Sequence, residues 1–253
     1  MEGSGDYTAH MEWFEKAFGD DYETVYPHRD EDSARAEIEG LLERIGPLPD
    51  GPVVDVACGT GRHTRALAAA GRPCLGIDLS IVLLERAAAR SSGIGWVRGD
   101  FRALPVRERS VAMVTSLFSS FGYLASADDD WLHLAAMARL AAPGGVMVLD
   151  VANPEAVRST LVAESHREAR GVSITEWRRI EGDQVVKDVV LVDGAGKREW
   201  TERLRLHSPE RLAGWIASSG LVVQNLWGGF AGEAADGAAA RRLFVARRSV
   251  DAT

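Results

Sequence analysis

The sequence contains few cysteines and no long hydrophobic run. Its two cysteines, Cys58 and Cys74, do not form a CxxC pair, so we expect neither a disulfide framework nor a zinc site. No stretch approaches the roughly 18 apolar residues that a membrane-spanning helix requires. The first residues, MEGSGDYTAH, lack the basic segment and the apolar stretch of a secretory signal. These absences predict a cytoplasmic protein with no membrane partner.

An excess of positive charge is also absent. Lysine and arginine together number 29 against 37 acidic residues, which gives a formal net charge of −8. Proteins that neutralise phosphates gather basic residues on one face. Here the basic clusters are three arginine pairs, and we expect the last two to lie on a solvated sheet edge: Arg178-Arg179, Arg241-Arg242 and Arg247-Arg248. We therefore predict no nucleic-acid partner.

Residues 53–78, VVDVACGTGRHTRALAAAGRPCLGID, predict one βαβ unit. The valine-rich run favours a strand that is buried on both faces of a sheet. Small residues such as Gly59 and Gly61 then allow a tight turn and the close approach of a ligand. A helix follows, and a second strand ends at Asp78, about twenty residues beyond Gly59, where an acid can bind both hydroxyls of a ribose. The unit is suited to hold a nucleoside.

Two kinds of cofactor carry such a nucleoside. A dinucleotide fingerprint has a third glycine beneath the pyrophosphate, but Thr64 stands at that position. The loop instead resembles the first motif of class I S-adenosylmethionine-dependent methyltransferases, with an alanine at the first glycine position: Asp55, Ala57, Gly59 and Gly61. Asp78-Leu79-Ser80 resembles the second motif, and the Pro143-Gly144-Gly145 turn before Leu149-Asp150 is similar to a later one. The resemblance implies S-adenosylmethionine as the cofactor.

The resemblance also implies where the cofactor is bound. Asp78 would bind the ribose, with Leu79 beside it as a further cofactor-binding candidate. Asp100, in the string RGDFRALP, would bind the adenine amino group with Phe101 packing nearby. Gly99-Asp100 is also ordinary turn chemistry, so a surface turn is the alternative. The other cofactor-binding candidates are Tyr22, Arg29, Asp55, Ala57, Cys58, Gly59, Gly61, Ser116 and Phe118.

Residues 6–29 form an aromatic N-terminal extension with two interpretations. It is either a short helix that covers a domain edge by aromatic packing, or a lid over the site. The entry Tyr22 to Arg29 resembles a YxxxY-P-HR string of small-molecule methyltransferases, which implies contacts with the cofactor carboxylate or the substrate. His28 is our candidate for the general base, because it lies in this lid and titrates near neutral pH.

The loop after the strand predicted at 111–117, FSSFGY, should face the transferred methyl group, because ligands bind at the carboxyl ends of such strands. It lacks the D/N-P-P-Y/F tetrapeptide of enzymes that methylate nucleobase or glutamine amides, and resembles the small-molecule members. Tyr123 is a catalytic candidate, although it and Phe121 are equally compatible with core packing. The substrate candidates are Tyr26, Phe121, Asn153, Trp177 and Arg203. Asp150 and Asn153 supply too few oxygens for a divalent metal, so we expect none.

Alternation of apolar and polar residues at 172–177, 184–192 and 199–206 predicts antiparallel strands inserted after the fifth core strand. In the resembled family such a layer covers the site and assists homodimer contact. We expect an α/β fold: a doubly wound, seven-stranded, mostly parallel sheet with an antiparallel C-terminal hairpin. The expected parts are an N-terminal helical lid (1–46), the cofactor-binding core (47–162), the antiparallel insertion (163–206) and the C-terminal helix and hairpin (207–253).

The sequence therefore predicts an S-adenosylmethionine-dependent methyltransferase that acts on nitrogen or oxygen of a small-molecule acceptor. Two alternatives remain. A non-catalytic S-adenosylmethionine-binding protein would share the motifs. A nicotinamide-dependent oxidoreductase would share the βαβ unit, but Thr64 and the lack of a Tyr-x-x-x-Lys pair argue against it.

Overall fold

A seven-stranded sheet forms the centre of the protein. The computed structural model describes residues 14, 16–27 and 30–250. The strand order is β10-β11-β5-β4-β1-β2-β3, and β11 runs antiparallel to both of its neighbours while the other pairings among β1 to β5 are parallel. The strands are β1 (Val53–Val56), β2 (Cys74–Asp78), β3 (Gly95–Arg98), β4 (Val111–Ser116), β5 (Ala141–Ala152), β10 (Val222–Trp227) and β11 (Arg241–Arg247). The predicted core sheet and its C-terminal hairpin are confirmed.

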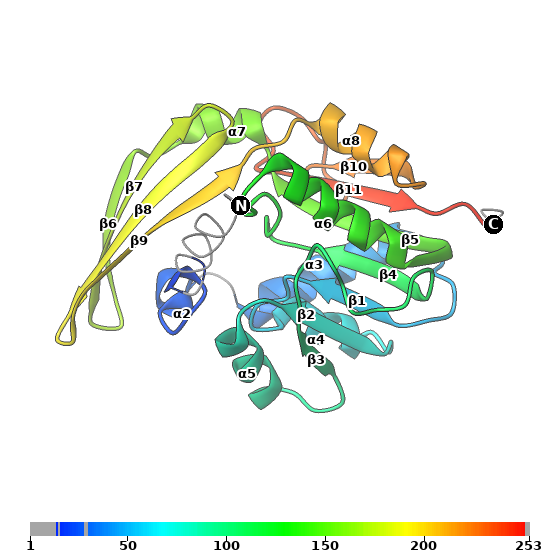
Figure 1. Cartoon of the computed structure of the whole chain (residues 1–253), viewed down its shortest axis with the longest axis horizontal. Coiled ribbons are helices and arrows are strands. Elements are labelled where there is room, and N and C mark those ends of the chain that lie inside the picture. The colour runs from blue at the N-terminus through cyan, green and yellow to red at the C-terminus, as the bar shows by residue number, and fades with distance from the viewer. Residues whose placement is uncertain (1–13, 15, 28–29, 251–253) are drawn as a thin grey trace, which may run out of the picture.

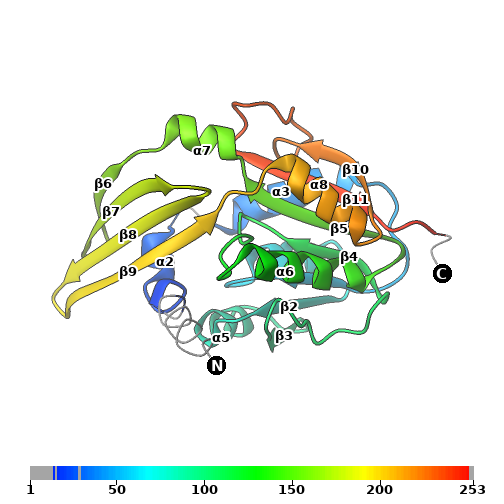
Figure 2. The same cartoon turned by 45° about the horizontal axis from the view of Figure 1, so that its top comes forward.

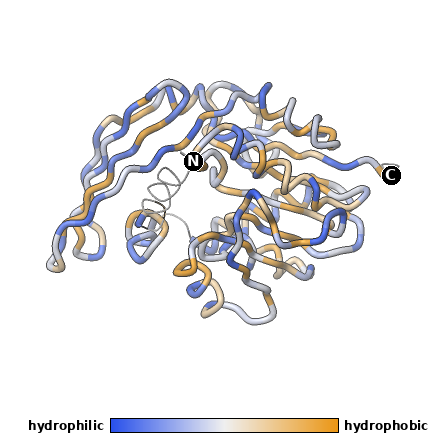
Figure 3. The backbone as a smooth tube through the Cα atoms, viewed as in Figure 1, coloured by the Kyte–Doolittle hydropathy of each residue, from blue (hydrophilic) through white to orange (hydrophobic). Residues whose placement is uncertain are grey.

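Helices cover both faces of this sheet, because its central strands are apolar on both sides. Val54 and Val56 pack toward α6 and α8, whereas Val53 packs toward α3 and α4. Figure 3 shows hydrophobic stretches in the strands and helices that meet at the middle of the molecule. The helices of the core are α3 (Glu31–Arg44), α4 (Arg62–Ala69), α5 (Ile81–Ala89), α6 (Ala127–Leu140) and α8 (Pro209–Ser218). No helix in the described part of the chain is both long and apolar enough to cross a membrane.

The predicted antiparallel insertion is a separate four-stranded sheet. It follows α7 (Pro154–Thr160), a helix that we did not predict, and pairs in the order β6-β7-β8-β9. The strands are β6 (Glu164–Ala169), β7 (Val172–Glu181), β8 (Gln184–Asp193) and β9 (Gly196–Arg205). We missed β6 because its sequence, ESHREA, contains no β-branched or aromatic residue. Its backbone pairs with β7 all the same.

The N-terminal segment lies between the two sheets. Its helix α2 (Tyr22–Val25) faces the inner side of the four-stranded sheet, which projects from one end of the molecule (Figures 1 and 2). Ala17 and Val25 share a small apolar core with Ile174, Val189 and other residues of that sheet. The segment is therefore part of the packing and also covers the carboxyl ends of the core strands.

The arginines that flank the last strand are not a solvated edge. β11 lies between β5 and β10, so β10 forms that edge of the sheet. Arg242 and Arg248 are 5% and 6% exposed, and Arg248 donates hydrogen bonds to the carbonyl oxygens of Ala141 and Ala138. The expectation was wrong because sequence order places β11 last, whereas the hairpin inserts it into the interior of the sheet.

Candidate active site

The loop after β1 separates two adjoining cavities. Ala57, Gly59 and Gly61 all have positive φ, at 58°, 57° and 76°. At Gly61 a Cβ atom would lie 2.3 Å from the ring of Trp96, so only glycine fits there. Ala57 and Gly59 contribute to the walls of both cavities. The small residues of this motif thus allow the turn and leave open space above it.

The first cavity lies at the carboxyl ends of β2 and β3, with His133 of α6 and Tyr22 of the N-terminal segment in its wall. Its lining is mostly apolar, with a few convergent polar groups, which is typical of a site for a nucleoside. The residues in its wall include Asp78, Leu79, Asp100, Phe101, Tyr123 and His133.

The second cavity is more polar and lies over the start of α4. Its wall includes Tyr26, Cys58, Thr60, Arg62, His63 and Arg170. Five residues line both cavities: Tyr22, Ala57, Gly59, Phe118 and Ser120. A ligand that fills the first cavity and an acceptor in the second would meet at these shared residues.

Asp78 is held in place by backbone donors. Its Oδ2 accepts a hydrogen bond from the Gly59 amide at 2.8 Å, and its Oδ1 accepts one from the Ser80 amide at 2.8 Å. Burial raises the pKa of this carboxyl to about 6, against the opposing effect of these amides. Each oxygen keeps a lone pair for a further donor, such as a ribose hydroxyl.

Asp100 has a strong partner within its own loop. The Arg102 guanidinium donates to both of its oxygens, with Nη2 to Oδ2 at 2.6 Å, and this hydrogen bonding lowers the pKa of Asp100. Arg102 also reaches Asp129 in the first turn of α6, at 2.9 Å. The arginine therefore joins the loop after β3 to α6 along one wall of the first cavity.

Phe118 occupies the boundary between the cavities in a strained conformation, with φ of 60°. Its amide donates to Asp150 Oδ2 at 2.7 Å, and the same oxygen accepts from Arg241 at 2.7 Å. The Arg62 and Arg241 guanidinium carbons lie 4.4 and 5.5 Å from the centre of the Phe118 ring. These contacts fix the aromatic side chain where the two cavities meet.

Hydrogen bonds join the segment around α2 to the core and to the insertion. Toward the core, Ser80 Oγ donates to the Phe18 carbonyl oxygen at 2.6 Å. Toward the insertion, Arg198 Nε donates to Asp21 Oδ2 at 2.7 Å and Arg167 to the Val25 carbonyl oxygen at 2.5 Å. The segment thus holds Tyr22 over both cavities.

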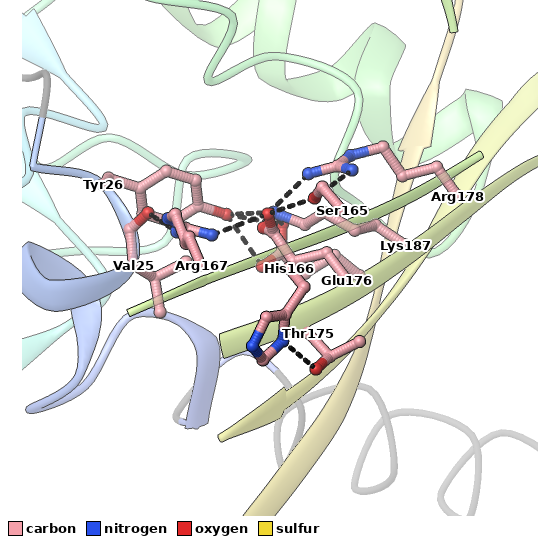
Figure 4. A network of polar contacts seen from close by, with 10 residues as sticks. Val25, Tyr26, Ser165, His166, Arg167, Thr175, Glu176, Arg178 and Lys187 are labelled. Atoms are coloured by element: carbon pink, nitrogen blue, oxygen red, sulfur yellow. Dashed lines mark hydrogen bonds and ion pairs between the residues drawn. The ribbon is translucent and has the colours of Figure 1, made fainter. Parts of the chain in front are cut away.

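A polar network on the inner face of the insertion reaches the second cavity (Figure 4). The Tyr26 hydroxyl donates to the buried Glu202 at 2.8 Å and accepts from Lys187, whose ammonium also lies over the Tyr26 ring. Glu176 accepts hydrogen bonds from Arg167 and Arg178 at 2.9 and 2.6 Å. Tyr26, which lines the second cavity, is thereby oriented by strands of the insertion.

The structure places most of the predicted cofactor residues in the cavity walls, but three support the walls from behind. Asp55 is 2% exposed, and its oxygens accept from Thr64 at 2.6 Å and from Thr115 at 2.8 Å. Ser116 is fully buried, and Gly61 packs under Trp96. None of these three lines either cavity, so their contact with the cofactor stays a prediction.

Four predicted substrate residues do not lie in a cavity wall. Phe121 belongs to the hydrophobic core, and Asn153 is buried, where its amide caps α7 and donates to the Ala239 carbonyl oxygen. Trp177 is exposed, and Arg203 pairs with Glu181 on the surface of the insertion. Tyr26 and Tyr123 do line the cavities. His28 and Arg29 lie outside the described residues.

The sequence reasoning missed several wall residues: Arg62, His63, Arg102, His133 and Arg170. Arg62 and His63 are 6% exposed although both are polar and begin a helix. The sequence signal for these two residues was their position: both are ionisable, and they follow the glycine loop directly. Arg170 comes from the β6–β7 turn, which strand patterning alone does not place near the core.

Comparison with known proteins defines the class of this fold and site. Residues 53–145 match the family model described as a methyltransferase domain. Among solved structures, a S-adenosylmethionine-dependent methyltransferase from Clostridium acetobutylicum has a TM-score of 0.76 at 17% identity, covering 96% of this chain and 99% of the other. The S-adenosylmethionine-bound CalS10, an amino pentose methyltransferase from Micromonospora echinaspora, has a TM-score of 0.66 at 25% identity, covering 91% and 98%.

Two relatives match along most of their length. The dTDP-3-amino-3,6-dideoxy-alpha-D-glucopyranose N,N-dimethyltransferase of Streptomyces fradiae is 32% identical over 221 residues, which cover 83% of this chain and 86% of the relative. The dTDP-3-amino-3,4,6-trideoxy-alpha-D-glucopyranose N,N-dimethyltransferase of Streptomyces venezuelae is 29% identical over 230 residues, covering 87% and 96%. The chain belongs to the class I S-adenosylmethionine-dependent methyltransferases. It is an enzyme of this family, and its cofactor is S-adenosylmethionine.

Proposed function

We propose that the protein transfers methyl groups from S-adenosylmethionine to the amino nitrogen of a small molecule, and that this acceptor is an amino sugar carried on a nucleotide. The observation that supports the proposal is the pair of cavities that meet at Phe118 and Tyr22. The two N,N-dimethyltransferases named above, which match this chain over more than four fifths of its length, act on amino sugars linked to dTDP.

The first cavity fits the nucleoside of the cofactor. The backbone-held carboxylate of Asp78 is suited to the ribose, Leu79 and Phe101 provide apolar walls, and Gly59 keeps the space over the β1 loop open. Tyr22, Ala57 and Gly59 would hold the remainder of the cofactor at the shared boundary. When bound there, the cofactor supplies an activated methyl group on a sulfonium, and the faces of Tyr22 and Phe118 suit such a cation.

The second cavity fits an acceptor with negative charge. Arg62 and Arg170 line this cavity together with one acidic residue, Glu23, so the arginines outnumber the carboxylates in its wall. Arg62 lies 3.4 Å from Glu37, and guanidinium groups bind phosphate oxygens in a forked geometry. Burial lowers the pKa of His63, which also hydrogen-bonds Glu37 at 2.7 Å, so its imidazole is neutral at physiological pH. The charge of the cavity therefore favours a nucleotide-linked acceptor.

The chain's main contribution to the reaction is alignment. The bound cofactor would supply its methyl group to a free amine, and the residues of the chain would position that amine and leave room for the ammonium product to lose a proton. Holding the two reactants at about 3 to 3.5 Å can supply roughly 7 to 11 kcal/mol of the barrier. Tyr26 on the acceptor side and Phe118 at the boundary, both fixed by several contacts, would restrict the acceptor to this approach. His28 as the base and Tyr123 as a catalytic residue stay predictions, as do the cytoplasmic location, the homodimer and the lack of a nucleic-acid partner.

A three-substrate comparison tests this proposal. The purified protein is incubated with S-adenosylmethionine and a dTDP-linked amino sugar, the corresponding dTDP-linked sugar with a hydroxyl group, or the free amino sugar. We expect mass spectrometry to show the addition of one and then two methyl groups to the first compound, far more slowly to the third, and not to the second. Methylation of the hydroxyl compound at an equal rate would contradict an amine acceptor. Equal rates for the free amino sugar and the dTDP-linked amino sugar would contradict recognition of the nucleotide.

A further inference from the structure

His63 lies in the wall of the second cavity, close to the residues that this cavity shares with the first. It is the second residue of α4, directly after the glycine loop, and is 6% exposed. Its ring packs near two phenylalanines, with its centroid 6.3 Å from that of Phe118 and 6.2 Å from that of Phe230. Because Phe118 lines both cavities, the imidazole is close to the place where an acceptor would meet the methyl group.

Glu37 on α3 determines which nitrogen of this ring carries the proton. Its Oε2 lies 2.7 Å from His63 Nε2. Burial alone would raise the pKa of Glu37. The hydrogen bond with His63 and the charges of Arg62 and Arg241 outweigh burial and lower that pKa, so the carboxylate is ionised and can only accept. In the neutral imidazole, Nε2 is therefore the donor and Nδ1 carries the lone pair.

The lone pair on Nδ1 is open to the cavity. This atom forms no hydrogen bond with a described residue and, unlike Nδ1 of the buried His207, it is not enclosed by protein. Since His63 belongs to the wall of the second cavity, the space next to Nδ1 is the space that the acceptor would occupy. A carboxylate on one nitrogen and an open cavity on the other is the arrangement of a histidine that accepts a proton from a substrate.

The charges around the ring keep it able to accept a proton. Burial is the largest influence on the pKa of His63 and, with Arg62, lowers it against the opposing effect of Glu37, so the ring is neutral at physiological pH. The ionisable groups of this cluster come from five elements: Arg62 on α4, Glu37 on α3, Asp55 on β1, Asp150 on β5 and Arg241 on β11.

We propose that His63 is the general base of the reaction, with Nδ1 taking a proton from the ammonium form of the acceptor. The nitrogen–hydrogen bond of the ammonium breaks, its electron pair stays on the amine as the nucleophile, and the proton forms a bond with Nδ1. Glu37, a positioning residue, stabilises the imidazolium until it releases the proton to water. The same step serves the methylammonium product before a second transfer. The proposal rests on the amine acceptor proposed above.

The pH dependence of methyl transfer tests the assignment. The kcat for the dTDP-linked amino sugar is measured at saturating S-adenosylmethionine from about pH 6 to about pH 10, a range that spans the titration of histidine and of amines. Near neutral pH we expect His63→Gln to lower kcat about 100-fold, because a general base contributes about 10²- to 10⁴-fold. Above the pKa of the acceptor amine, solvent removes the proton, so the variant should come within about 5-fold of the wild type. His166→Gln, an exposed histidine on β6, is the control and should keep the wild-type profile.

Nitrogen-15 NMR of the imidazole tests the proton position without any substrate. In the free protein near neutral pH, His63 should show a protonated Nε2 and a bare Nδ1, with the signals assigned by their loss in His63→Gln. Glu37→Gln can donate to Nε2, so it should reduce this form of the ring and lower kcat about 10-fold or more.

Four results would overturn the proposal: a kcat of His63→Gln within about 3-fold of the wild type near neutral pH, a loss that is equal at every pH, a protonated Nδ1 in the wild type, or a pH-dependent loss confined to His28→Gln. If thermal unfolding shows that His63→Gln is not folded, His63→Ala replaces it, and added imidazole should restore its activity. A wild-type protein that methylates no dTDP-linked amino sugar would contradict the proposed function, whereas the NMR result bears on His63 alone, so the two failures are distinguishable.

Discussion

Arg205 and Asp130 form a buried ion pair that joins the insertion to the core. Arg205 Nη1, at the end of β9, lies 2.6 Å from Asp130 Oδ2 at the start of α6, and their side chains are 7% and 0% exposed. The same guanidinium donates to the carbonyl oxygens of Leu124 and Ala125. Leu124 and Ala125 line the first cavity, so one arginine holds the insertion and the cavity loop together.

Substitution of this arginine should destabilise the protein strongly. We expect Arg205→Met to lower the free energy of unfolding by about 3 to 5 kcal/mol, because the buried Asp130 would lose its arginine and keep the contact of its Oδ2 with His207 Nε2 at 2.9 Å. Arg203→Met is the control two residues away on the same strand, where the pair with Glu181 is exposed and its loss should cost about 1 kcal/mol or less. Denaturant unfolding measures both variants. Similar losses would show that the buried pair contributes no more than a surface pair.

Binding of S-adenosylhomocysteine should depend on pH through Asp78. In the protein without ligand, burial gives the Asp78 carboxyl a pKa of about 6. A hydrogen bond from a ribose hydroxyl favours the ionised form of this carboxyl. Affinity should therefore be constant above about pH 7 and should fall as pH decreases through 6, because the proton must be released on binding. Asp78→Asn should bind about 10- to 150-fold more weakly at pH 7 and should lose the pH dependence. Calorimetry across this range checks both expectations; an unchanged profile in the variant would place the ribose elsewhere.

Gly61 should tolerate no side chain. In Gly61→Ala the new Cβ would lie 2.3 Å from Trp96 at a positive φ of 76°. The overpacking and the left-handed backbone should together cost about 2 to 5 kcal/mol. Gly71→Ala is the matched control, because its φ is +90° but no atom lies within 4 Å of the added carbon. That control should cost only about 1 kcal/mol. If the midpoint of thermal denaturation shifted equally in both variants, the contact with Trp96 would not explain the loss of stability in Gly61→Ala.

Tyr26→Phe should weaken binding in the second cavity and leave binding in the first cavity nearly unchanged. The tyrosine lines the second cavity only, and its hydroxyl is the link to Glu202 and Lys187. We expect the KM for the acceptor to rise about 5- to 10-fold, while the affinity for S-adenosylhomocysteine changes less than 2-fold. Steady-state kinetics and calorimetry provide the two measurements. A parallel loss in both would mean that the variant disturbs Tyr22 and the boundary rather than the acceptor side.

Local patterns in the sequence were sufficient for the core sheet and the cofactor turn. Ser80 caps α5 by accepting a hydrogen bond from the Leu83 amide, and the valines of β1 are buried on both faces. Such features depend on residues a few positions apart, whose chemistry is visible in the sequence.

The supporting contacts were not predictable, because they join distant residues. Asp55 stands at the acid position of the first motif. One of its oxygens accepts a hydrogen bond from Thr115, which is 60 residues away in the sequence. His133 belongs to no motif of the sequence, and only the folded structure places it in the wall of the first cavity. The polar segment β6 forms a strand because its backbone pairs with β7, and its own composition does not indicate a strand.

The insertion leaves the core after β5 and α7 and returns through Arg205 just before α8, so both of its connections lie in one stretch of the chain. The pairing of the seven core strands does not pass through it. Changes in length at the β7–β8 and β8–β9 turns, away from Arg167, Arg198 and Arg205, should therefore leave the register of the core strands unchanged. The side of the second cavity that Arg170 lines therefore belongs to a unit whose strands pair separately from the sheet that carries the glycine loop and Asp78.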